Sequence, residues 1–458
     1  MPILEIRLLP PMAIARFGSS QTPLEAYELK VPEDDPLGFR QICPSTTLEI
    51  DPDTGEVSRA YIPERIKFRD GDKIRPVAPF LEVFARTSED VIEPLTLDLL
   101  AAEGLGPDAI KWKIDVANIK AFRQTGDQND RIIAGTGWFS DHAVKDLRGE
   151  CQNFREGKTL PFGHARYIKP SSEHPEIRLR FTPAKGKVYG SSLKGFDPTT
   201  GLPSQKDNPV FGGDESRILY DPAKGTWFGF QSTSPRTATN PDDIYEGAED
   251  YSSDPKKLGH SQGYFDDVCD GPLSAELTLK SGETLAARAW ISSCMPAFAP
   301  DSEPFRTVAD ELEQLILGPE VAHRGNLQAE AAEIVRRMLE TVRHMNTMVM
   351  NGNVISGRVN IAHTLGTQDS NDFARNYAPV MASSLADNLA VRLLHERIYT
   401  ALLSGTAPWF SEVLRRPEEV GDLSDKGRRK MPPMLRGADS RTLALTRRQI
   451  AKVTQAAK

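Results

Sequence analysis

The sequence predicts an α+β protein in which a β-rich N-terminal domain with long loops is followed by a mainly helical C-terminal unit. Apolar and polar residues alternate from Ile110 to Val116 and from Leu273 to Leu279, which is the period of half-buried strands. After Pro304 the apolar residues take the spacing of amphipathic helices. We therefore expect the two domains at residues 1–300 and 301–458.

The first part of the chain predicts short strands between loops. Ile3 to Leu8 is the first expected strand, ended by two prolines, and Arg75 to Ala85 contains another. Residues 32–72 are rich in Pro, Asp and Gly and predict a long surface excursion. Residues 123–265 have little regular pattern, and strands are expected only at Glu176 to Phe181, Arg217 to Tyr220 and Thr226 to Phe230.

A turn rich in carboxylates leads into the clearest hairpin, which pairs Leu273 to Leu279 with a return strand over Thr284 to Ile291. Its mouth carries Asp266, Asp267 and Asp270. An Asp-rich turn can hold a hard cation, but the same side chains also fix a bend by binding backbone groups. We favour the structural role and expect no metal site.

The C-terminal part predicts helices over Phe305 to Leu317, Leu327 to Met350 and Ser384 to Gly405. In the long helix, Ile334, Val335, Met338 and Leu339 are among the residues that fall on one face. We expect the β-rich domain to cover this face.

Composition excludes several classes of function. The formal net charge is −8, and no basic run is longer than Lys426 to Lys430, so a nucleic-acid partner is not expected. No run of eighteen apolar residues is present, so no membrane span is expected. The apolar opening is broken by Glu5 and Arg7 and does not predict a signal peptide. These features together predict a cytoplasmic location.

Motif searches exclude further classes. The chain contains neither Gly-x-Gly-x-x-Gly after a strand nor a P-loop motif. His395-Glu396 begins like a zinc-protease motif, but Tyr399 stands where the second histidine is needed. The four cysteines are far apart and include no Cys-x-x-Cys, so neither a disulfide framework nor a zinc site is indicated.

Four segments carry a family resemblance: Ile14 to Ser20, Ile110 to Ala121, Gly263 to Leu279, and Ala289-Trp290-Ile291 leading to Phe298-Ala299-Pro300. In this order they resemble the lysine ε-oxidase and glycine oxidase family (LodA/GoxA-like) over most of the chain. The resemblance implies the fold of amino-acid and amine oxidases whose active members carry a cysteine tryptophylquinone.

The residues that form this quinone in the family are not found at the corresponding positions. The family's cysteine segment corresponds to Met431 to Asp439 and its tryptophan segment to Leu443 to Gln449, yet no cysteine follows Cys294 and no tryptophan follows Trp409. Trp290 and Cys294 are the nearest pair, but four residues of a strand span roughly 13 Å, beyond thioether distance. We therefore expect no quinone cofactor.

Two functions stay open, and no catalytic residue is assigned. One is a non-catalytic homologue that binds an amino-acid-like molecule or a protein partner, and the missing quinone residues favour it. The other is an oxidoreductase acting on an amine or amino acid through a relocated quinone or another cofactor. A homo-oligomer is compatible with either. The candidate pocket and hairpin-mouth residues are Arg16, Tyr264, Asp266, Asp267, Asp270 and His363.

Overall fold

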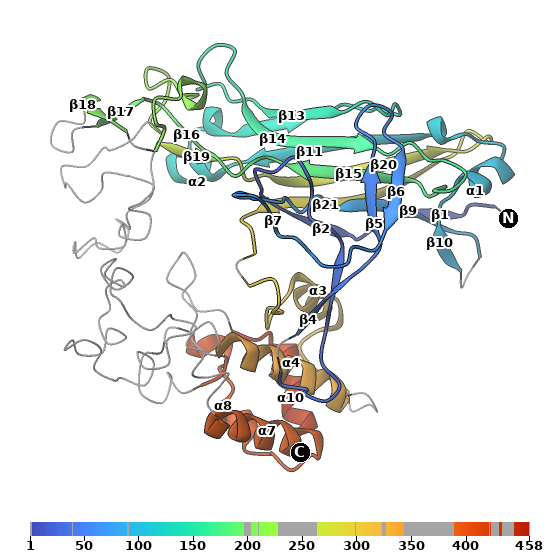
Figure 1. The fold of residues 1–458 in the computed structure, drawn as a ribbon, viewed down its shortest axis with the longest axis vertical. Coiled ribbons are helices and arrows are strands. Elements are labelled where there is room, and N and C mark those ends of the chain that lie inside the picture. The colour runs from blue at the N-terminus through green and yellow to red at the C-terminus, as the bar shows by residue number, and fades with distance from the viewer. Residues whose placement is uncertain are drawn as a thin grey trace. The chain divides into compact units, whose positions relative to one another are not determined.

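A computed structural model describes residues 2–38, 40–88, 91–196, 203–208, 210–227, 263–297, 299–322, 327–342, 389–420, 422, 430–432 and 444–457. The chain divides into two compact units. The sheet unit comprises Met1–Glu28 and Pro44–Phe298, and the helical unit comprises Leu29–Cys43 and Ala299–Lys458. Strands dominate the first and helices the second (Figure 1), which confirms the predicted fold class.

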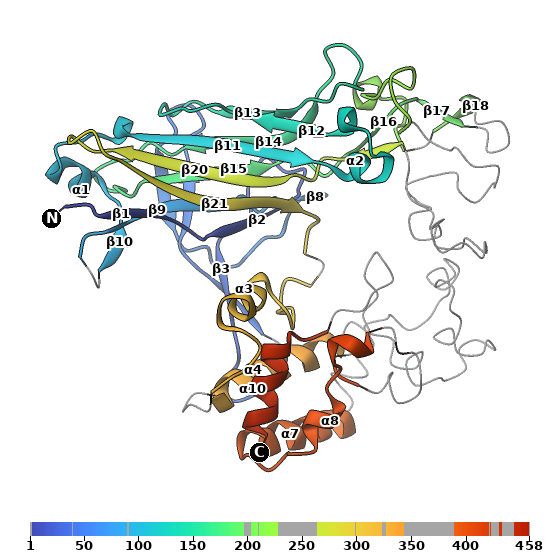
Figure 2. The ribbon, with the colours of Figure 1, turned by 180° about the vertical axis from the view of Figure 1, so that it is seen from behind.

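Two sheets form the body of the sheet unit and stack as two layers (Figure 2). The six-stranded sheet has the order β1 (Glu5–Leu9), β9 (Phe80–Arg86), β15 (Arg178–Pro183), β14 (Leu160–Tyr167), β13 (Lys145–Gly149), with β10 (Ile92–Pro94) also on β9. The five-stranded sheet has the order β12 (Ile132–Gly135), β11 (Ile110–Asn118), β20 (Asp270–Thr278), β21 (Thr284–Cys294), β2 (Met12–Arg16).

The inward faces of both sheets share one hydrophobic core, because alternate residues of each strand point to the same side. Leu81 and Phe181 from the six-stranded sheet and Trp112 and Ile291 from the five-stranded sheet are all fully buried in it. The period-two pattern that predicted β11 and β20 therefore marks the core face correctly.

The remaining strands form two-stranded pairs. The two-stranded pairs are β3 (Tyr27–Lys30) with β4 (Gln41–Pro44), β5 (Thr47–Ile50) with β6 (Val57–Tyr61), β7 (Arg69–Asp70) with β8 (Lys73–Ile74), β16 (Val188–Gly190) with β19 (Tyr264–Asp266), and β17 (Lys194–Phe196) with β18 (Pro203–Asp207). Helices α1 (Leu97–Ala102) and α2 (Lys120–Thr125) flank β11 in sequence.

The prediction for residues 123–265 was incomplete: β15 confirms the strand expected at Glu176 to Phe181, but β12, β13 and β14 also come from this stretch and were not expected. Strand β14 was not predicted because Pro161 and Gly163 interrupt its apolar–polar alternation. In the structure a β-bulge shifts the register between β13 and β14 at this point. The strand expected at Arg217 to Tyr220 is instead a 3₁₀ helix, Glu215–Arg217, followed by isolated bridges.

The helical unit contains α3 (Val308–Leu317), α4 (Leu327–Val342), α7 (Leu389–Leu403), α8 (Phe410–Val413) and α10 (Arg447–Ala456). Its core includes Ile334, Leu402, Phe410 and Val453. The face of α4 through Ile334 is thus covered by helices of the same unit, and the expectation that the β-rich domain covers it was wrong. Among the described helices, none has the length and apolar character that a membrane crossing requires.

Candidate functional site

The four segments that carry the family resemblance contribute adjacent strands of the five-stranded sheet. Ile114 of β11 lies opposite Leu273 of β20, and β20 pairs along its length with β21. The parallel neighbour of β21 is β2, where Arg16 lies opposite Cys294. Segments up to 280 residues apart in the chain are therefore brought side by side (Figure 1).

The hairpin predicted at β20 and β21 is confirmed, and the three carboxylates lie at its open end. The chain that leads into β20 is extended, so its side chains alternate between the two sides. Phe265, Asp267 and Cys269 are buried, whereas Asp266 is half-buried and Asp270 is exposed. Each carboxylate at this mouth therefore has a different environment.

Asp267 is completely buried. Its Oδ2 accepts hydrogen bonds from the backbone N–H groups of Gly186 and Lys187, both at 3.0 Å, and its Oδ1 has no hydrogen-bond partner among the residues that the structure describes. The pKa of Asp267 is raised to about 6, chiefly by burial and to a smaller extent by the Asp266 carboxylate, and the hydrogen bonds from the two amides only partly offset this rise. The side chain thus joins the turn at residues 186–187 to the hairpin mouth.

Asp266 binds the end of β11. Its side chain forms an ion pair with Lys120, and Asn118 donates to both its carbonyl oxygen and its Oδ1 at 3.0 Å. Sequence reasoning missed Asn118 and Lys120, although a signal was present. Asn118 continues the buried series that runs through Trp112 and Val116, and a polar residue at such a position needs a partner.

The structure does not bring the other predicted site residues, Arg16, Tyr264 and His363, together at the hairpin mouth. Arg16 donates to the carbonyl oxygen of Met295 at 3.1 Å, and among the described residues it forms no ion pair with Asp266 or Asp267. The hydroxyl of Tyr264 accepts from Asn208 at 2.8 Å. His363 lies outside the described residues.

A second buried polar group lies beyond the hairpin mouth. Asp130 is fully buried, and its carboxylate accepts from Tyr220 at 2.7 Å, Asn153 at 2.8 Å and Thr125 at 2.6 Å. Nothing in the sequence pattern indicated this network. Both carboxylate oxygens are satisfied, so Asp130 anchors loops and offers no free acceptor to a ligand.

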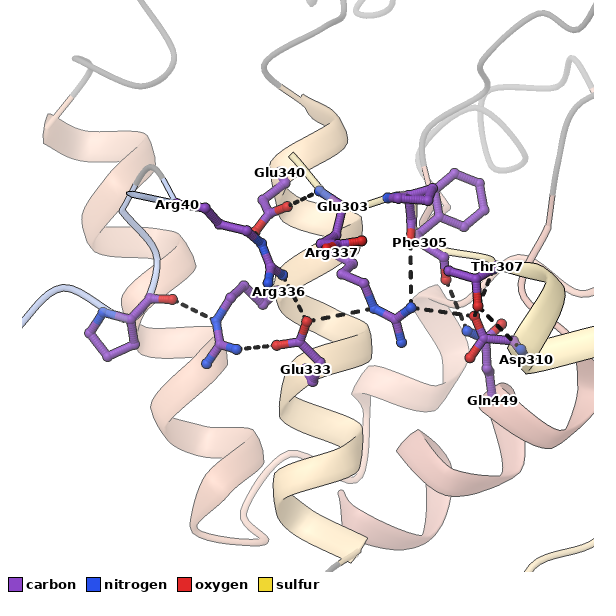
Figure 3. A network of polar contacts seen from close by, with 12 residues as sticks. Arg40, Glu303, Phe305, Thr307, Asp310, Glu333, Arg336, Arg337, Glu340 and Gln449 are labelled. Atoms are coloured by element: carbon purple, nitrogen blue, oxygen red, sulfur yellow. Dashed lines mark hydrogen bonds and ion pairs between the residues drawn. The ribbon is translucent and has the colours of Figure 1, made fainter. Parts of the chain in front are cut away.

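The helical unit holds a network of charged side chains around the buried pair Arg40 and Glu340 (Figure 3). Arg40 binds Glu340 at 2.6 Å and Glu333 at 2.7 Å, and Glu340 also accepts the backbone N–H of Glu303 at 3.0 Å. Burial lowers the pKa of Arg40, but the two carboxylates raise it by more, and the net change is upward. This network fastens residues 29–43 to α4.

Trp290 and Cys294 are not placed to form the thioether of a cysteine tryptophylquinone. Trp290 and Cys294 both lie on β21, where four residues span roughly 13 Å. Cys269 is buried beside Ser293, and burial raises its thiol pKa to about 12, whereas Trp290 is 41% exposed on the other side of the strand. In α10, Thr446 and Gln449 form a capping box. This helix contains neither cysteine nor tryptophan.

Metal ligands show no grouping either. Among the described residues, no three His, Cys, Asp or Glu side chains are close enough together to hold a metal ion. Asp267 is buried on one side of the extended chain, whereas Asp266 and Asp270 lie on the other side, because successive residues alternate in direction.

No family model and no curated protein matches this chain. Among solved structures it is similar to L-Lys ε-oxidase from Marinomonas mediterranea, including a Schiff base intermediate of that enzyme with L-Lys. The identity is 14%, and the TM-scores are 0.48 and 0.45. The alignments cover 99% of this chain and 60% of the oxidase chain, so this chain spans about 60% of the length of those structures.

Proposed function

We propose that this protein is a LodA/GoxA-like homologue that has no cysteine tryptophylquinone of its own and binds an amino-acid-like molecule or a protein partner without oxidising it. The environment of the tryptophans and cysteines carries the proposal. Trp290 and Cys294 are too far apart along β21 for a thioether, and α10 supplies neither residue. The resemblance of the four segments, now adjacent strands, supports a retained scaffold.

Oxidation of an amine removes two electrons from the substrate, and an enzyme needs a group that accepts them. Ordinary side chains do not act as electron sinks, and this role belongs to cofactors. The thiol of Cys269 is also a poor nucleophile, because its raised pKa keeps it protonated near neutral pH. Binding without turnover is the activity that these side chains support.

Intact-mass spectrometry of the purified protein tests the proposal. We expect the mass of the unmodified chain, no visible absorption band, and no hydrogen peroxide on addition of L-lysine or glycine. Trp290→Phe and Trp409→Phe variants serve as matched controls, because each should differ from the parent only by the mass of the substitution.

A loss of hydrogen with gain of oxygen that disappears in one of these variants would overturn the proposal. So would peroxide release from the parent protein. Either result would favour the oxidoreductase with a relocated quinone or another cofactor.

A further inference from the structure

Arg180 lies on the outward face of the six-stranded sheet, and its side chain has no hydrogen-bond or ion-pair partner among the described residues. It belongs to β15, where Leu179 and Phe181 point into the core and Arg180 points the other way. Its guanidinium lies over the ring of Phe80 on the neighbouring strand β9, 5.0 Å from the ring centre. The ring holds the guanidinium in place but supplies no negative charge.

The lack of a carboxylate distinguishes Arg180 from other arginines in a similar environment. Its Nε is buried and forms no hydrogen bond within the described part of the chain. Three other arginines share this feature but have a carboxylate at the guanidinium, namely Arg75 with Glu25, Arg178 with Glu176, and Arg337 with Asp310. Burial lowers the pKa of Arg180 to about 10, so it stays charged at neutral pH. A partly buried charge without a counterion costs stability, and an anion that reached it would stabilise the fold.

The neighbouring side chains on this face leave Arg180 as the available cation. Arg166 lies opposite it on β14. The guanidinium of Arg166 donates to the backbone carbonyl oxygens of four residues, His142, Asp51, Pro52 and Asp53. Burial lowers the pKa of His164, the next outward residue of β14, so its imidazole is neutral near pH 7. Arg178, two positions before Arg180, is already paired.

We propose that Arg180 binds the carboxylate of a small monoanionic molecule on the outward face of the six-stranded sheet. The planar fork of a guanidinium matches the two oxygens of a carboxylate. Arg180 is half-buried, so part of this fork is within reach of solvent. One available guanidinium balances one negative charge. The inference deepens the proposed function and rests on it, because an amino-acid-like molecule carries such a carboxylate.

The ligand-free protein gives the first test, by thermal melting in chloride buffer. Arg180→Met removes the charge and keeps an unbranched side chain over Phe80. We expect it to melt at or above the wild-type temperature, because a charge without a counterion is lost. Arg178→Met is the matched control. Arg178 also lies over Phe80, at 5.9 Å, but pairs with Glu82 and Glu176, so its loss should lower the melting temperature.

Melting in sodium acetate against sodium chloride at equal ionic strength gives the second test. We expect acetate at ten times its dissociation constant to raise the wild-type melting temperature by about 1 to 2 °C above that in chloride. Glycine should act in the same direction. Arg180→Met should melt at one temperature in all three. Arg7→Met should keep the wild-type response, because Arg7 lies on the same sheet and is paired with Glu5. General effects of acetate on hydration act on every variant alike.

Four results would overturn the proposal. Arg180→Met melting below the wild type in chloride would assign the guanidinium a carboxylate of the same chain. A wild type that melts alike in acetate and chloride would show that no carboxylate binds, and an equal acetate response in Arg180→Met would place binding elsewhere. A larger response to phosphate than to acetate, lost in Arg180→Met, would make the ligand a dianion. The mass and peroxide measurements do not depend on these results, so the proposed function and the Arg180 site fail separately.

Discussion

Asp267 in the sheet unit and Glu340 in the helical unit are both buried carboxylates, but their partners differ. Glu340 faces the guanidinium of Arg40 and a backbone N–H. Asp267 faces two backbone N–H groups, and within the described part of the chain its second oxygen has no hydrogen-bond partner. A cation compensates the charge of a buried carboxylate, whereas amides do so only in part. The comparison teaches that the effect of burial on a carboxylate depends on its partners, and that Asp267, which has amides in place of a cation, has a raised pKa.

The largest expected loss of unfolding free energy follows from removing the Arg40 guanidinium. Arg40→Ala removes the guanidinium that binds the buried Glu340, and breaking a buried pair in this way costs about 3 to 5 kcal/mol of unfolding free energy. Urea denaturation of the full-length chain measures the cost.

Arg7→Ala is the control for this measurement. Arg7 and Glu5 form an exposed ion pair that solvent screens, so the substitution should lower the unfolding free energy far less than Arg40→Ala does. Equal costs for Arg7→Ala and Arg40→Ala would contradict the view that burial makes the Arg40 pair important.

The next largest effect is the pH dependence of stability that the titration of Asp267 causes. Its pKa rises from 3.8 to about 6 on folding, so the native state binds the proton more tightly and stability falls as pH rises between these values. Above pH 6 this cost is at most about 3 kcal/mol. Asp267→Asn keeps an acceptor for Gly186 and Lys187 and removes the charge. We expect it to match the wild type near pH 3.5 and to be more stable at pH 8.

Thermal melting of the wild type, Asp267→Asn and Asp267→Ala over this pH range separates the two roles of the side chain. Asp267→Ala removes the acceptor of both amides and should lose about 1 kcal/mol or more for each N–H left unpaired. A difference between Asp267→Asn and the wild type that does not vary with pH would show that Asp267 stays ionised in the fold.

Local pattern predicted the elements but not their partners. Strands β11 and β20 were predicted because one face of each is buried along its whole length. The helical spacing of α3 was also visible, but the period of a helix does not say which face turns inward. Ion pairs with Arg448 and Lys452 decide that, and both residues lie more than 130 positions away.

The buried carboxylates show the same limit. Asp267 was chosen because it precedes the hairpin, yet its contacts to Gly186 and Lys187 come from a stretch without regular pattern. Arg40 lies 300 residues from Glu340, inside a segment that was predicted to be a surface excursion. Contacts between residues that are far apart in the sequence depend on the tertiary fold. Local hydrophobic periodicity therefore cannot predict them.

The smallest expected effect is at Asp270. The three carboxylates of the hairpin mouth look alike in the sequence, and a common stabilising role predicts similar costs for their removal. In the structure Asp270 is exposed, whereas Asp267 is buried and bonded to two amides. We therefore expect Asp270→Ala to change the unfolding free energy by less than about 0.5 kcal/mol. If thermal melting showed Asp270→Ala to be as destabilised as Asp267→Ala, the mouth would act as one cluster, and the contrast between buried and exposed carboxylates would not explain its stability.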